Sequence, residues 1–317
     1  MNTAVLFGEQ AHLDQEAQTN SLEDLFVERK NSNRPEEDLA SKLALDRFVR
    51  GFEYREIDGI WLSEDKLALT NMSLLLNARR LGNVNDQEYV IKIPGIFSAP
   101  SKKPGVPNEL TTLAHLPSHP NIPEIIATGT ISSAVETDRY PYFVMEKEKR
   151  GTLSDLLPIE NPEGLRQALN LVAGATEAVI VAHEEGIVHL DIKPDNILNA
   201  GDTGKLTDWS SGDEIGAQPI NILEIPVSVG FTSPEDAFGL VKYTYASDSH
   251  GIGRTLLRVI STLSPEDNLN LDGWADNVTS VIEVLRGYAE LCAHKDSRKR
   301  RPPVEILEVL HKIIEKV

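Results

Sequence analysis

Residues 187–198 of the chain read IVHLDIKPDNIL. The stretch contains an aspartate, a lysine and an asparagine, namely Asp191, Lys193 and Asn196. They follow a histidine and lie between two apolar runs. A carboxylate, a cation and an amide at this short spacing suit the handling of a phosphate group and its metal ion. A solvated turn after a buried helix can contain the same residue types, so the rest of the chain has to decide between the two interpretations.

The composition is that of a chain that can form its own hydrophobic core. It has 317 residues, of which 40% are hydrophobic, enough for one large domain or for two lobes. The net charge of −18 argues against a nucleic-acid backbone or an anionic membrane as the main partner. A single cysteine, Cys292, excludes an intramolecular disulfide and favours a reducing compartment.

No segment has the pattern of a membrane span or of a signal peptide. The longest apolar tract, residues 168–190, is interrupted by Glu177, His183 and Glu184, whereas a membrane-spanning helix needs about 20 predominantly apolar residues. The first ten residues contain neither a basic region nor a long apolar run. We therefore expect a soluble, cytoplasmic protein that binds neither nucleic acid nor a membrane.

The hydrophobic pattern of the first half predicts a sheet. Segments with the alternating or apolar pattern of strands are 73–81, 88–93, 124–132 and 140–147. The turn-rich residues 82–87 join the first two segments into a predicted hairpin. A helix is expected to start near Pro107 and to carry residues 109–116.

Beyond Gly151 helical spacing dominates, and the longest predicted helix covers residues 161–186, with short strands expected within 196–209. This order predicts an α+β, bilobal fold with a small β-rich lobe and a larger α-helical lobe. The predicted parts are an acidic, partly helical extension (residues 1–65), the first lobe (66–146) and the second lobe (147–317). Within the extension, residues 36–53 predict an amphipathic helix with Leu39, Leu43 and Phe48 on one side.

Further motifs occur in a fixed order around the opening stretch. They are EYVIKI (88–93), NELTTLAHLPSHPNI (108–122), YFVMEKEKRGTLSDLL (142–157), KLTDWSSG (205–212), VSVGFTSPE (227–235), SDSHGIG (247–253) and RKRRPPVEIL (298–307). Each is weak or moderate alone, but together with HLDIKPDN their order and spacing resemble those of eukaryotic-like protein kinases, from about residue 66 to residue 312. The lysine two places after Asp191 is the form found in serine/threonine kinases.

The resemblance implies a role for each residue of the catalytic loop. Asp191 would accept or orient the proton of the acceptor hydroxyl, and Lys193 would steady the γ-phosphate of ATP. Asn196 would bind a second Mg²⁺. In KLTDWSSG, Asp208 would hold Mg²⁺ between the β- and γ-phosphates. Trp209 replaces the usual phenylalanine there and is expected to fill the same apolar position.

The same resemblance implies a set of ATP-binding residues. Lys92 would hold the α- and β-phosphates, and Glu109 would pair with that lysine. Met145 would be the gatekeeper, and backbone groups of Glu146 and Glu148 would hydrogen-bond the adenine. Leu198 is the last of the residues expected to bind ATP.

Three other matches concern the fold rather than the chemistry. Ser228 occupies the position of a threonine that usually bridges the catalytic aspartate and lysine. Asp248 occupies the position of the helix aspartate that anchors the catalytic loop. Arg301, or alternatively Arg300, would be the buried partner of Glu235.

The nucleotide-binding end departs from the family pattern. There is no glycine between Ile60 and Gly82, where a glycine-rich loop should let backbone N–H groups approach the phosphates. Val90 replaces a small alanine, and Leu190 replaces an arginine that commonly pairs with a phosphorylated activation loop. We therefore predict that phosphorylation of this region is not the on-switch, the candidate positions being Ser210, Ser211, Thr232 and Ser233. Strong activation by a phosphomimetic substitution there would contradict this.

The leading hypothesis is an ATP- and Mg²⁺-dependent serine/threonine kinase that acts on protein substrates. The alternative is a pseudokinase, an interaction module with weak or no phosphotransfer, which the missing glycines favour. A third possibility is a small-molecule phosphotransferase of the aminoglycoside or choline kinase type. Lys193 and the predicted pair between Glu235 and an arginine argue against it, because that class resembles kinases in the catalytic loop but lacks both features.

Overall fold

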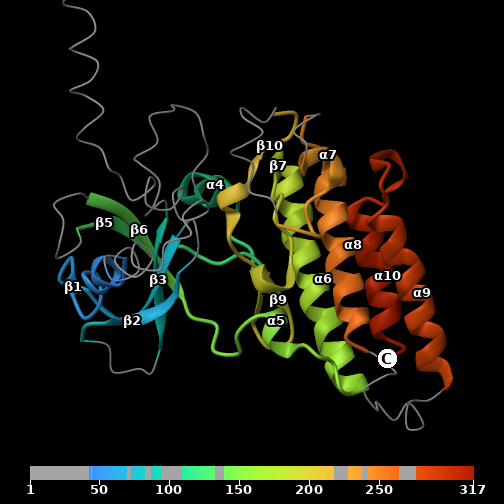
Figure 1. Ribbon diagram of the computed structural model, residues 1–317, viewed down its shortest axis with the longest axis horizontal. Helices are drawn as coiled ribbons and strands as arrows, with labels where there is room; N and C mark the ends of the chain where they lie inside the picture. Colours follow the sequence, from blue (N-terminus) through green and yellow to red (C-terminus); the bar gives the residue numbers. More distant parts are fainter. Residues whose placement is uncertain are drawn as a thin grey trace, which may run out of the picture. The chain divides into compact units, whose positions relative to one another are not determined.

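The computed structural model describes residues 43, 45–69, 73–82, 87–94, 109–132, 139–217, 228–237, 242–263 and 276–317. The chain divides into two compact units (Figure 1). The first unit consists of residues 1–106 and 126–145, and the second of residues 107–125 and 146–317. The β-rich first part and the helical second part confirm the predicted α+β class.

The first unit contains a six-stranded sheet in the order β1-β2-β3-β4-β6-β5. Its strands are β1 (Glu56–Ile57), β2 (Trp61–Leu69), β3 (Ser73–Arg80), β4 (Tyr89–Pro94), β5 (Ala127–Ser132) and β6 (Arg139–Glu146). Strands β3 and β4 pair antiparallel with Leu76 opposite Ile91, which confirms the predicted hairpin. Of its predicted turn, residues 83–86 lie outside the described residues.

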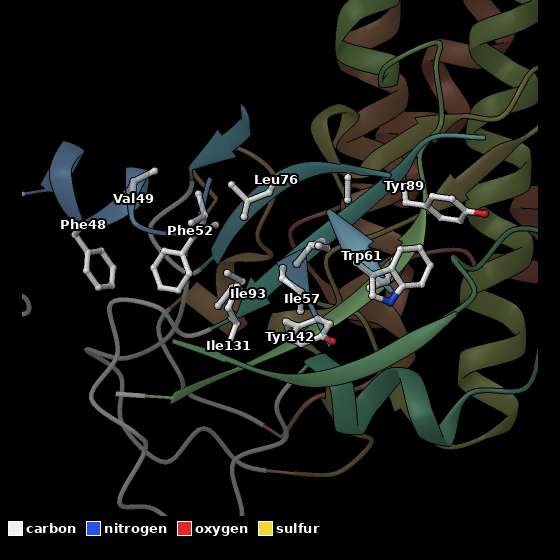
Figure 2. Close-up of a cluster of buried hydrophobic side chains, with 14 residues drawn as sticks. Phe48, Val49, Phe52, Ile57, Trp61, Leu76, Tyr89, Ile93, Ile131 and Tyr142 are labelled. Atoms are coloured by element: carbon white, nitrogen blue, oxygen red, sulfur yellow. The ribbon is translucent and has the colours of Figure 1, made fainter. Parts of the chain in front are cut away.

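The sheet begins before the predicted boundary at residue 66. Strand β1 pairs with the start of β2, because Ile57 and Trp61 are both apolar and both buried in the core of this unit. Figure 2 shows that core, in which the Trp61 and Tyr89 rings meet edge-to-face at 4.9 Å. Residues 55–65 of the predicted extension therefore contribute to the first unit.

The predicted helix within the extension also packs on this core. Residues 45–50 are helical, and the Phe48 and Phe52 rings meet edge-to-face at 5.3 Å (Figure 2). Leu43 was expected on the same side as Phe48, but it is 61% exposed. The buried side is formed instead by Phe48, Val49 and Phe52, and Leu39 lies outside the described residues.

The second unit is built around one long helix, α6 (Pro162–Glu184), which confirms the helix predicted at 161–186. Asn161 caps its start, since its side-chain oxygen accepts a hydrogen bond from the backbone N–H of Gly164, and Pro162 occupies the first turn. Helices α8 (Tyr245–Ser261) and α10 (Pro303–Ile314) pack against α6, and α9 (Asp276–Cys292) packs against α8 (Figure 1).

The remaining elements of the second unit are short. They are α4 (Glu109–His115), α5 (Leu153–Leu156), β7 (Ile187–Val188), η1 (Pro194–Asn196), β8 (Ile197–Asn199), β9 (Gly204–Leu206), η2 (Trp209–Ser211), β10 (Asp213–Glu214), α7 (Pro234–Ala237) and η6 (Ser297–Lys299). Helix α4 confirms the prediction for residues 109–116. Within the described residues, no helix has the length and hydropathy to cross a bilayer.

Residues 107–125 belong to the second unit, although the predicted boundary assigned them to the first lobe. The reason is a set of hydrogen bonds made by Asn121. Its side-chain amide donates to the Gly204 carbonyl (2.7 Å) and to the Thr203 hydroxyl (2.6 Å), and its own carbonyl accepts from the backbone of Leu206 (2.8 Å). These bonds fasten the segment after α4 to the β8–β9 hairpin.

The same hairpin lies very close to α6. A Cβ atom on Gly174 of α6 would lie 2.6 Å from the Gly204 carbonyl oxygen, closer than real Cβ contacts allow. Glycine is therefore needed at residue 174 for helix and hairpin to touch. This close packing determines where β8 lies, and with it Asn196, the residue that immediately precedes the strand.

Candidate active site

Asp248, in the first turn of α8, holds the start of the catalytic loop. One carboxylate oxygen accepts a hydrogen bond from the backbone N–H of Leu190 (2.8 Å), and the other accepts from the backbone N–H of His189 (2.9 Å) and from Nε2 of His183 (2.8 Å). Burial alone would raise the pKa of Asp248, but the hydrogen bond and charge of His183 outweigh it and lower that pKa. The predicted anchoring by Asp248 is confirmed.

This anchor supports a turn that leucine does not favour. Leu190 has a φ of 68°, in the left-handed region that costs energy for residues other than glycine. Next to it, His189 accepts from the Asp191 N–H through Nδ1 (3.2 Å) and places Nε2 3.0 Å from the Thr207 carbonyl. This arrangement fits a neutral imidazole with its proton on Nε2, and burial lowers the pKa of His189 accordingly.

The carboxylate of Asp191 is held by three side chains. Lys193 Nζ and Asn196 Nδ2 donate to one oxygen at 2.7 and 3.0 Å, and the Ser228 hydroxyl donates to the other at 2.5 Å. Ser228 Oγ also accepts from Lys193 Nζ at 2.8 Å, so the predicted bridge between aspartate and lysine is confirmed. The network fixes the carboxylate in position and leaves the loop with few alternative arrangements.

Asn196 and Asp208 are the two residues predicted to bind metal. Asn196 is the last residue of η1, and Asp208 lies just after β9. Asn196 commits its Nδ2 to Asp191, which leaves Oδ1 as the amide atom that can bind a cation, and its carbonyl accepts from the backbone of Thr207 (2.9 Å). Asp208 follows Thr207 with a φ of 63°, and one of its oxygens accepts from Ser210 (2.9 Å). Both are hard oxygen donors, which Mg²⁺ prefers.

The oxygen donors of Asn196 and Asp208 suit a magnesium ion that takes its other ligands from water and phosphate, rather than a metal site whose ligands all come from the protein. In the described part of the chain, no three histidine, cysteine, aspartate or glutamate side chains converge. Mg²⁺ is usually bound through one or two carboxylates, with waters and substrate phosphates as further ligands.

Trp209 occupies an apolar position beneath this segment, as expected. Its side chain is fully buried, and its indole N–H donates to the Leu206 carbonyl at 2.9 Å. The indole also meets the His189 ring edge-to-face at 4.6 Å. The indole of Trp209 is larger than the ring of phenylalanine, yet it fits this position and its N–H has a hydrogen-bond partner.

The predicted ATP-binding residues are divided between the units. In the first unit, Lys92 and Val90 are buried on β4, and Met145 is buried near the end of β6. In the second unit, Glu109 is buried as the first residue of α4. The predicted pair between Lys92 and Glu109 would join the two units and stays a prediction.

The remaining three predicted ATP-binding residues border one hollow of the second unit, which has a volume of about 160 Å³. Glu146, Glu148 and Leu198 line it together with Lys205 and residues 118–120 and 122–124. Lys205 forms an ion pair with Glu148 at 2.5 Å that sequence reasoning did not anticipate. Leu198 and Lys205 are directly opposite each other in the β8–β9 hairpin and so share a face, which places Lys205 beside Leu198 at this hollow.

The structure decides between the two candidate partners of Glu235 in favour of Arg300. The guanidinium of Arg300 binds both carboxylate oxygens, at 2.5 and 2.7 Å, and donates to the carbonyls of His294 and Ala246. Arg301, the first choice from the sequence, is wrong, because its side chain is 48% exposed and lies 3.6 Å from Glu305. The guanidinium also lowers the pKa of Glu235, although burial alone would raise it.

His183 is a functional candidate that sequence reasoning missed. It lies in the last turn of α6 and pairs with Asp248, 65 positions away in the sequence. No motif marks this histidine, and the interruption of an apolar tract was the only signal at its position.

Two buried histidines make the second unit sensitive to acid. Burial lowers the pKa of His189, and burial and the charge of Arg300 lower that of His250 to about 4. Because the unfolded chain binds these protons more readily, the stability from both residues is complete above the unfolded pKa of about 6.5 and is lost as the pH falls below it.

We predict that the free energy of unfolding falls as the pH drops from 6.5 toward 4, with His250 contributing up to about 1.4 kcal/mol per pH unit and the lowered pKa of His189 acting in the same direction. Urea unfolding across this range measures the slope. His250→Asn removes one titrating ring and should make the decline shallower. A decline as steep in this variant as in the native chain would refute the contribution of His250.

Comparisons with known proteins agree with the geometry. The family model of the protein kinase domain matches residues 80–316. The serine/threonine-protein kinase PrkC of Bacillus subtilis is 33% identical over 211 residues, which are 66% of this chain and 29% of that protein. The serine/threonine-protein kinase PknB of Mycobacterium leprae is 30% identical over 152 residues, which are 47% of this chain and 24% of that protein.

The chain thus spans less than a third of the length of these relatives. Its matched region contains the catalytic-loop network, the Asp208 segment and the Glu235–Arg300 pair. The chain belongs to the protein kinase family.

Proposed function

We propose that this protein transfers the γ-phosphoryl group of ATP to serine and threonine hydroxyls of protein substrates. The observation that carries the proposal is the closed network in which Lys193, Asn196 and Ser228 hold the carboxylate of Asp191. A chain without catalytic work could lose any of these polar groups at little cost to folding. Similarity to serine/threonine-protein kinases over the same region supports the proposal further.

Each residue has a separate part in the proposed reaction. Asp191 accepts a hydrogen bond from the acceptor hydroxyl and aims its oxygen at the γ-phosphorus. It takes the hydroxyl proton as the bond from this oxygen to phosphorus forms, while the bond from the γ-phosphorus to the oxygen of the β-phosphate breaks and ADP leaves. Lys193 balances the negative charge of the phosphoryl group, and Lys92 does the same for the α- and β-phosphates. Asn196 Oδ1 and Asp208 would hold Mg²⁺, which when bound neutralises charge on the phosphates.

A pseudokinase remains the second candidate because of the nucleotide-binding end. No glycine occurs between Ile60 and Gly82, and the buried Val90 takes the place of a smaller residue on the same strand as Lys92. Such a protein would retain the fold and present its surface to a protein partner. A small-molecule phosphotransferase is disfavoured, since the bidentate Glu235–Arg300 pair and Lys193 belong to protein kinases.

The test is transfer of labelled phosphate from ATP to generic acceptor proteins with Mg²⁺ or Mn²⁺, followed by phosphoamino-acid analysis. Label on serine and threonine that disappears in Asp208→Asn establishes the proposed function. In parallel, ATP with Mg²⁺ at about 100 times its dissociation constant should stabilise the protein by about 2.7 kcal/mol. Absence of both label and stabilisation would refute the proposal and favour the pseudokinase.

A further inference from the structure

The segment that carries Ser228 forms a tight turn closed by Thr232. The Ser228 carbonyl accepts hydrogen bonds from the backbone N–H groups of Phe231 (2.9 Å) and Thr232 (3.1 Å). In the opposite direction, the Ser228 N–H donates to the side-chain oxygen of Thr232 at 2.9 Å. Gly230 at the middle has a φ of 87°, and Arg254 of α8 donates to its carbonyl.

Thr232 is therefore bonded to both backbone groups of Ser228. The contact from the Thr232 hydroxyl to the Ser228 carbonyl measures 3.3 Å, longer than a usual O–H···O bond, so the 2.9 Å contact with the N–H is the stronger one. Among the described residues, the side-chain hydrogen bonds of Thr232 go to Ser228 alone. The side chain is half-buried, so its contribution is local to this turn.

The position of the Ser228 backbone matters because of what its side chain does. Its hydroxyl donates to Asp191 and accepts from Lys193, and both bonds require one particular direction of the Cβ–Oγ bond. Serine is not branched at Cβ and is less restricted in χ1 than threonine. Correct placement of the hydroxyl therefore depends more heavily on a fixed backbone at residue 228.

We propose that Thr232 is a positioning residue for catalysis: its side chain clamps the Ser228 backbone so that the Ser228 hydroxyl holds Asp191 and Lys193 in reactive geometry. The proposal rests on the proposed kinase function. Thr232 touches neither the acceptor nor ATP in this role and acts only through Ser228.

The test compares Thr232→Val, which has the same shape without a hydroxyl, with Thr232→Ser, which retains the hydroxyl. We expect Thr232→Val to lower kcat about tenfold, with little change in KM for ATP. A tenfold change in rate corresponds to the net contribution of about one hydrogen bond. Thr232→Ser should recover most of the rate. The matched control is Thr176→Val, which removes a buried hydroxyl bonded to the Val172 carbonyl within α6 and should leave kcat unchanged.

Three outcomes would overturn the proposal. They are an unchanged kcat in Thr232→Val, an equal loss of kcat in Thr232→Val and Thr232→Ser, and a loss of kcat matched by a fall in melting temperature larger than that of Thr176→Val. The last outcome would show a merely structural role.

Hydrogen exchange separates this proposal from the kinase function itself. The Ser228 amide should exchange slowly in the native chain and at least tenfold faster in Thr232→Val, whether or not the protein transfers phosphate. Equal exchange in both proteins would refute the clamp. Faster exchange together with an inactive native chain would retain the clamp and reject the proposed function.

Discussion

Asp191→Asn is expected to lower kcat by about two to four orders of magnitude, the usual contribution of a positioned general base. Asparagine has nearly the same shape, but its amide cannot take the proton of the acceptor hydroxyl. It also replaces one carboxylate oxygen with an NH₂ group, which must then face a donor from Ser228, Lys193 or Asn196. Steady-state phosphotransfer to an acceptor protein measures the rate, and thermal stabilisation by ATP with Mg²⁺ reports whether nucleotide binding survives.

The same loop provides a matched control. Asp195 lies on η1, four residues from Asp191, and its side chain is exposed to solvent. Asp195→Asn makes the same chemical change without touching the network and should retain the native rate. If Asp191→Asn kept more than about a tenth of the native rate, Asp191 would not be the base. A native chain that is itself inactive would instead favour the pseudokinase.

Arg300→Met is expected to destabilise the protein by about 3–5 kcal/mol, because it leaves the Glu235 carboxylate partly buried without its partner. The Arg300 side chain is fully buried, and its guanidinium satisfies two oxygens of Glu235 and the carbonyls of His294 and Ala246. All of these acceptors would lose a donor at once. Chemical unfolding in urea at neutral pH measures the change.

Arg301→Met is the control, since it removes the same side chain one residue along the chain. The exposed pair that Arg301 forms with Glu305 should contribute less than about 1 kcal/mol. Adding Glu235→Gln to Arg300→Met should recover part of the loss, because the second change removes the unpaired charge. Equal effects of the two arginine variants would contradict the assignment of Arg300 as the buried partner.

Much of the local structure was predictable from short-range pattern. The β3–β4 hairpin, helix α4 and helix α6 follow from hydrophobic spacing and turn residues, which act over a few positions. The exposure of Leu43 was not predictable. Helical spacing shows which residues share a side, whereas the neighbouring core decides which side is covered.

The candidate site was predictable in the same limited sense. The residue types of the catalytic loop and the bridge from Ser228 follow from ordered motifs, and the structure brings those side chains together. The clamp by Thr232 was missed although it spans only four positions, because a threonine in a loop can bond to many backbone groups. The pairing of Lys92 with Glu109 was proposed from resemblance and stays a prediction.

By itself, the sequence determined the fold class, the main helices and strands, and the residues able to handle phosphate, because periodicity and close spacing are properties of the chain. Only the tertiary structure decided that Arg300 rather than Arg301 is buried, that His183 pairs with Asp248, and that Asn121 joins residues 107–125 to the second unit. Neighbouring residues point in different directions, and partners far apart in sequence meet only when helices and hairpins pack. Such contacts depend on packing geometry, which no short stretch of sequence contains.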